Sequence, residues 1–74
     1  MFTLAWLNRK GQVKKELESC SSAMLKLWVV QNVTSGYAVI LDENYNIVEV
    51  FESKNKEMAM PIDREEFPFD ISVG

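Results

Sequence analysis

Residues 37–51 read YAVILDENYNIVEVF, two runs of strand-forming residues around a cluster of turn formers. The β-branched and aromatic side chains of residues 37–41 and 47–51 favour pleated strands, and residues 42–46 favour a reversal of the chain between them. The stretch therefore predicts a β-hairpin with strands near 36–42 and 47–53. Asn44 and Asn46 are the residues expected to take the positive φ that such a turn needs.

The N-terminus repeats this design in a weaker form. Residues 2–7 and 12–17 are candidate strands, and the segment between them ends in Gly11, which readily adopts a left-handed conformation. A shift of 34 positions places Leu7 on Leu41 and aligns the two turn segments. The sequence thus predicts two hairpins of similar construction.

The middle of the chain supports two interpretations. Apolar and small residues over 12–31 follow the three- and four-residue spacing of an amphipathic helix. However, the polar cluster at 19–22 contains three serines, which are poor helix formers, and residues 28–30 are Trp-Val-Val, which prefer a strand. We favour a break at the serines. The predicted strands are then 2–7, 12–18, 25–33, 36–42 and 47–53.

The favoured fold class is mainly β: a small antiparallel five-strand meander or partly open barrel with an extended C-terminal tail. The alternative is an α+β fold, with one helix over about 12–31 packed on an antiparallel hairpin sheet. At 74 residues the chain is one small domain. We expect residues 1–60 to form the β-rich domain, because Pro61 blocks continued strand pairing. Residues 61–74 are then an acidic and aromatic C-terminal tail, packed on the domain or on a partner.

The residue types present exclude several chemistries. The chain has no histidine and a single cysteine, so it has neither a disulfide nor a usual zinc ligand set. Residues 42–46 begin like a calcium loop, but Ile47 stands where that loop requires glycine and Ser53 where it requires a bidentate acid. No glycine-rich phosphate-binding motif is present. The sequence predicts a protein that is not an enzyme, with no catalytic residues, no metal and no cofactor.

Charge is divided unevenly along the chain. Residues 1–41 carry five Lys and Arg against two Glu, a net charge of +3, whereas residues 42–74 carry three against nine acids, a net charge of −6. One alternative function is nucleic-acid binding by a small β protein through the basic turn at 9–15, with Trp6 as a stacking platform. The candidate contacts are Arg9, Lys10, Lys14 and Lys15. A second alternative is an acidic inhibitor that mimics nucleic acid.

The favoured function is protein binding, as a small non-enzymatic regulatory or accessory module, with a homodimer as one option. The apolar segment in the C-terminal tail is a natural docking element. Its candidate interaction residues are Phe67, Pro68, Phe69 and Ile71. No charged-then-apolar leader and no membrane-spanning run is evident, and a lone cysteine fits a reducing compartment, so a cytoplasmic location without membrane contact is expected.

Overall fold

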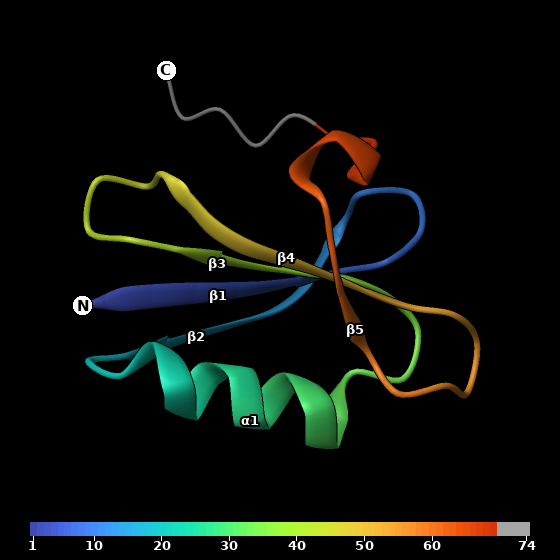
Figure 1. Ribbon diagram of the computed structural model, residues 1–74, viewed down its shortest axis with the longest axis horizontal. Helices are drawn as coiled ribbons and strands as arrows, with labels where there is room; N and C mark the ends of the chain where they lie inside the picture. The colour runs from blue at the N-terminus through green and yellow to red at the C-terminus, as the bar shows by residue number, and fades with distance from the viewer. Residues whose placement is uncertain (70–74) are drawn as a thin grey trace.

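The computed structural model describes residues 1–69, which form one open five-stranded antiparallel sheet with a helix on one face (Figure 1). The strands lie in the spatial order β2-β1-β3-β4-β5. The elements in chain order are β1 (Phe2–Leu7), β2 (Val13–Ser19), α1 (Ser22–Asn32), β3 (Gly36–Leu41), β4 (Ile47–Ser53), β5 (Met60–Ile62) and a 3-10 turn, η1 (Arg64–Glu66).

The predicted class, mainly β with five antiparallel strands, is confirmed, and the sheet is open rather than closed into a barrel. One predicted strand is wrong, because residues 25–33 lie almost entirely in α1. The Ser21 hydroxyl accepts a hydrogen bond from the Met24 N–H at 3.4 Å and caps the helix N-terminus. The serines therefore start a helix instead of ending one. The alternative interpretation anticipated this helix but began it ten residues too early, since residues 13–19 are β2.

The strand order differs from that of a simple meander because α1 carries the chain back across the sheet. After β2, the helix crosses one face and delivers β3 to the other side of β1 (Figure 1). β3 then pairs antiparallel with β1, with Leu4 opposite Ile40 and Leu7 opposite Tyr37. The fifth strand is β5, which pairs with β4 and spans the expected domain boundary after residue 60.

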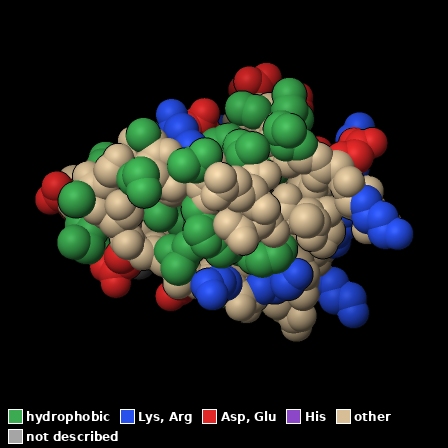
Figure 2. Space-filling view, turned by 90° about the horizontal axis from the view of Figure 1, so that it is seen from below, with side chains coloured by type: hydrophobic (Ala, Val, Ile, Leu, Met, Phe, Trp, Pro, Cys, Tyr) green, Lys and Arg blue, Asp and Glu red, His purple; other side chains and the backbone are tan. Residues whose placement is uncertain are grey.

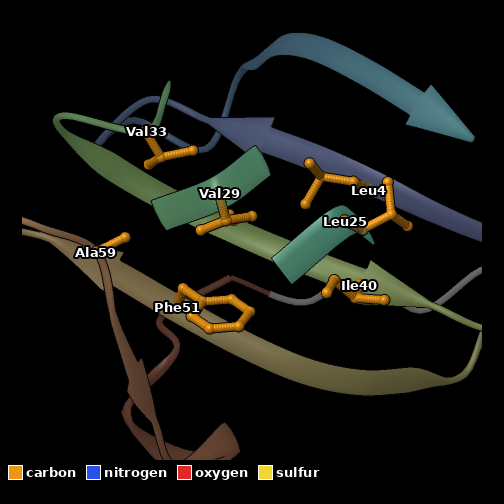
Figure 3. Close-up of a cluster of buried hydrophobic side chains, with 8 residues drawn as sticks. Leu4, Leu25, Val29, Val33, Ile40, Phe51 and Ala59 are labelled. Atoms are coloured by element: carbon orange, nitrogen blue, oxygen red, sulfur yellow. The ribbon is translucent and has the colours of Figure 1, made fainter. Parts of the chain in front are cut away.

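Between α1 and the sheet lies the first apolar cluster. Leu25 and Val29 point from α1 toward Leu4 on β1, Ile40 on β3 and Phe51 on β4 (Figure 3). Val33, Ala38 and Ala59 complete the buried set. Because successive strand residues alternate between faces, these strands contribute every second side chain to the helix side.

The opposite face of the sheet carries a second buried cluster, made of Leu7, Tyr37, Val39, Leu41, Val50 and Phe67. Phe67 follows η1 and meets the Tyr37 ring edge to face at 5.6 Å between centroids. Phe69 stacks edge to face on both of these rings at 5.7 Å. The start of the C-terminal tail thus covers part of the face that α1 leaves open.

The two hairpin turns have the same construction, as the 34-residue shift predicts. The Asn8 Oδ1 accepts from the backbone N–H of the residues two and four positions on, at 2.8 and 2.9 Å, and the Asp42 Oδ1 does the same at 2.8 and 2.9 Å. The left-handed residue is Gly11 in one turn and Tyr45 in the other, with φ of +85° and +62°. The expectation of positive φ at Asn44 and Asn46 is therefore wrong, because the side chain at position 42 fixes the turn geometry and places the left-handed residue three positions later.

Candidate interaction surfaces

The tail residues expected to contact a partner are placed largely against this chain's own sheet. Phe67 is buried, Phe69 is half-buried and Pro68 is exposed. An added Cβ at Gly11 would lie 2.7 Å from the Phe69 ring, which shows how closely this ring approaches the first turn. Ile71 lies outside the described residues. The role of this segment in binding another protein stays a prediction.

Arg9 is held against the second cluster by three contacts. Its guanidinium forms an ion pair with Glu52 at 3.1 Å and donates to the Ser53 carbonyl oxygen at 3.0 Å. It also lies over the Tyr37 ring, 5.5 Å from the centroid. Arg9 therefore joins the first turn to β4 on the side of the sheet that faces away from α1.

Lys14 is directed to the other side of the sheet. Its Nζ lies 4.1 Å from the centroid of the Trp6 ring, and Trp6 packs edge to face on Trp28 of α1 at 5.9 Å. The Trp6 indole N–H donates to the Ser35 carbonyl at 2.9 Å, so this ring is anchored within the fold. Lys14 is the extra residue of a bulge in β2, which turns it toward Trp6.

The four basic candidates for nucleic-acid contact thus do not form one surface. Arg9 and Lys14 lie on opposite faces, Lys10 is exposed in the turn, and Lys15 lies opposite Trp6 in the β1–β2 register. Nucleic-acid binding needs a continuous basic track together with an accessible stacking ring. The arrangement of these four residues favours neither a continuous basic track nor stacking on an accessible Trp6 ring.

The acidic half of the chain is likewise divided among local contacts. Glu52 pairs with Arg9, Glu49 pairs with Lys26 at 2.9 Å, and Glu43 lies 3.4 Å from the N-terminal amine. A mimic of nucleic acid requires a row of carboxylates facing solvent. These ion pairs reduce the number of carboxylates available for such a row.

The outward side of α1 is apolar and open to solvent. Met24, Leu27 and Val30 have 61%, 50% and 41% of their surface exposed, and we call these three residues the α1 outer face. Lys26 lies beside them but reaches to Glu49 on β4. Figure 2 views the molecule from the helix side; hydrophobic side chains spread over the left and middle of this view, with Lys and Arg side chains along its lower and right margins.

Across the sheet from α1, a shallow groove of about 580 Å³ lies over β1 and β2. Its floor includes the small side chains Thr3 and Ala5, and two carboxylates, Glu16 and Glu18, stand on its β2 side. Tyr45 stands at its far side, and none of the described residues that line the groove is Lys or Arg. We call this feature the β2 groove. Sequence reasoning missed it because the register that groups these residues becomes visible only once the strands are paired.

The Asp42 carboxylate in the second turn is held in its charged form by backbone hydrogen bonds. The hydrogen bond from the Asn46 backbone N–H has the largest effect and lowers the pKa of Asp42; desolvation opposes it, and the backbone N–H of Asn44 adds a smaller lowering, so the pKa lies below its usual value. Among residues 1–69, no cluster of three or more Cys, Asp or Glu side chains is arranged to hold a metal ion. Cys20 is exposed and not in a disulfide.

No helix within the described residues is both long enough and apolar enough to cross a lipid bilayer. The chain matches no protein-family model, no curated protein sequence and no solved structure.

Proposed function

We propose that this protein is a small protein-binding module that inserts the α1 outer face into an apolar groove of a partner protein. The observation that carries the proposal is the exposure of Met24, Leu27 and Val30 on one side of a helix whose other side already forms the core. A helix with apolar residues on two opposite sides ordinarily has both of those sides buried.

The spacing of these three residues suits recognition of α1 by a groove in a partner protein. Met24, Leu27 and Val30 are separated by three residues each, so their side chains form one row along the helix. Partner grooves that receive helices read anchors with this kind of spacing. The nearest charge, Lys26, is already engaged by Glu49, so docking would not bury an unpaired ammonium group.

The size of the surface favours a partner that also contacts the flanks of the helix. A stable interface buries roughly 800 Å² on each partner, which would be about one sixth of the 4923 Å² surface of the described chain. Three side chains supply only part of that area. A concave partner could contact the sides of α1 as well and so supply the remaining area.

Leu27→Glu tests this proposal, because it places a charge at the centre of the α1 outer face. Leu27 is half exposed, so the variant should fold with stability close to that of the wild type. Met58→Glu is the matched control, since Met58 is 62% exposed in the loop before β5 and is not part of the α1 outer face. Both variants and the wild type would be used as bait in native extract, with bound proteins quantified and solution mass measured in parallel.

We expect a defined protein to be retained at stoichiometric levels by the wild type and by Met58→Glu, and lost from Leu27→Glu. Equal capture by all three proteins would contradict the assignment of the α1 outer face. A wild-type dimer that Leu27→Glu converts to a monomer would identify a second copy of this chain as the occupant.

A further inference from the structure

β2 is an edge strand of the sheet, and no described strand pairs with its outer side. The backbone groups along such an edge can pair with an added strand. We propose that β2 binds an extended peptide with a basic-apolar-basic pattern, which adds to the sheet as a sixth strand.

The side chains of β2 define that pattern. Glu16 and Glu18 lie on the side of the β2 groove, while Leu17 between them is half-buried and packs toward the helix side. Residues directly opposite one another in paired strands share a face, with Cβ atoms about 5 Å apart. A bound strand would therefore place Lys or Arg opposite each glutamate and an apolar residue opposite Leu17.

The charge of the β2 groove favours a basic peptide over a neutral one. Two carboxylates on its β2 side have no Lys or Arg among the described lining residues to balance them. Thr3 and Ala5, which lie opposite Glu18 and Glu16 in the β1–β2 register, form the floor next to them, and methylene stems of Lys or Arg could lie on these small side chains. Basic side chains at alternate positions repeat at about 7 Å, which matches the spacing of Glu16 and Glu18 along the strand.

In two antiparallel registers, charge disfavours pairing of β2 with a second copy of itself. An antiparallel pair of β2 strands centred on Leu17 would place Glu16 directly opposite Glu18 of the second chain. A pair centred on Glu16 would place this residue opposite itself. Like charges directly opposite one another are destabilising in a sheet. These two registers are disfavoured, whereas registers that place Lys15 opposite Glu16 or Glu18 of the second chain are not, so the solution mass of the wild type belongs to the test.

This site is separate from the one assigned to α1, because the glutamates of β2 face the opposite side of the sheet from the helix. Either proposal can fail while the other stands. Leu27→Glu serves here as a variant that should leave peptide binding unchanged.

The test uses the full chain and three labelled nine-residue peptides with the central triplets Arg-Val-Arg, Glu-Val-Glu and Ser-Val-Ser, measured by fluorescence anisotropy. We expect measurable binding of the basic peptide alone, with affinity that falls as salt rises from 50 to 200 mM. Glu16→Lys combined with Glu18→Lys should weaken this binding about tenfold or more and transfer preference to the Glu-Val-Glu peptide. The matched control is Glu65→Lys combined with Glu66→Lys, which changes charge equally on η1 and should have no specific effect.

Backbone pairing is tested by N-methylation of the basic peptide. In an added strand, alternate N–H groups face β2, so methylation of one alternate set should abolish binding and methylation of the other should not. Equal loss from both sets would overturn strand addition. Absence of binding to the basic peptide, or binding that the charge reversal leaves unchanged, would overturn the proposal as a whole. The proposal would also be overturned if the wild type formed dimers in solution and the charge reversal dissociated them, because a second copy of the chain would then occupy the edge.

Discussion

Replacing Tyr45 by glycine should relieve a strained backbone, and it tests the account of the two matched turns. Tyr45 has φ of +62°, in the region that side-chain-bearing residues rarely adopt. At the equivalent position of the first turn the chain has Gly11, with φ of +85°. The hydrogen bonds to Asn8 and Asp42 show that both turns demand this conformation at the same place.

The size of the effect follows from two opposing terms. The left-handed conformation costs a residue with a Cβ roughly 1–2 kcal/mol. Glycine loses more backbone entropy on folding, a cost of roughly 0.5–1 kcal/mol. The tyrosine ring is 53% exposed and contributes some contact of its own, so the comparison that isolates the backbone is Tyr45→Gly against Tyr45→Ala. We expect the glycine variant to be more stable than the alanine variant by about 0.5–1 kcal/mol.

Urea unfolding followed by tryptophan fluorescence would measure this difference, since Trp6 and Trp28 report on the folded core. In a domain of this size the expected gap corresponds to roughly 2–8 °C in Tm. Gly11→Ala provides the reciprocal test and should destabilise by about 0.5–1 kcal/mol from the same two terms, with a further loss because Phe69 must move. The reasoning fails if Tyr45→Gly is no more stable than Tyr45→Ala, or if Gly11→Ala is neutral.

Three further predictions concern the core, the helix and the second turn. Phe67→Ala should lower the free energy of unfolding by about 3 kcal/mol, because it empties a buried aromatic site that contacts Tyr37. Denaturant unfolding should show a smaller loss for Phe69→Ala, because Phe69 is only half-buried. Ser21→Ala should lower stability by about 0.5–1 kcal/mol through loss of the helix cap, with helical circular dichroism as the readout, while Ser21→Asp should retain the cap. Asp42 has a lowered pKa, so its contribution to stability is complete above its unfolded pKa of about 4 and is lost as pH falls through the folded value. Asp42→Asn keeps the acceptor that Asn8 supplies in the first turn, and its stability should lack this acid-dependent component; an unchanged pH profile would contradict the assignment.

The second hairpin and the repeat of turn design were predictable from sequence because their signals are local. Strand-forming runs on either side of five turn residues identify the hairpin at 37–51, and the turn is closed by the carboxylate of Asp42 within its own five-residue segment. Local chemistry of this kind is visible without knowledge of the tertiary fold. The identity of the left-handed residue was missed because residue preference favours asparagine, whereas position in the turn selects Tyr45.

The helix was misassigned because intrinsic preference conflicts with tertiary packing. Residues 28–30 favour a strand when taken alone, yet Val29 is fully buried beneath the sheet as part of α1. The cap at Ser21 was available as a signal, since serine ahead of an apolar run is typical of a helix N-terminus. The consequence for function is large, because the α1 outer face exists only if residues 24–30 are helical.

The β2 groove could not be predicted from spacing in the sequence. Its lining combines Glu16 and Glu18 with Thr3 and Tyr45, which come together only through the β1–β2 pairing and the return of β3 beside β1. The expectation about Phe67 rested on its aromatic character in the segment that follows Pro61, but the structure shows this ring buried and packed on Tyr37 of its own chain.

The central claim, that the α1 outer face is the contact with a partner protein, is tested most directly by site-specific photo-crosslinking in native extract. A photoreactive residue at position 27 should form a covalent adduct with a single defined protein, and the same residue at position 58 should not. Adducts that are absent at position 27, or equal at both positions, would contradict the claim.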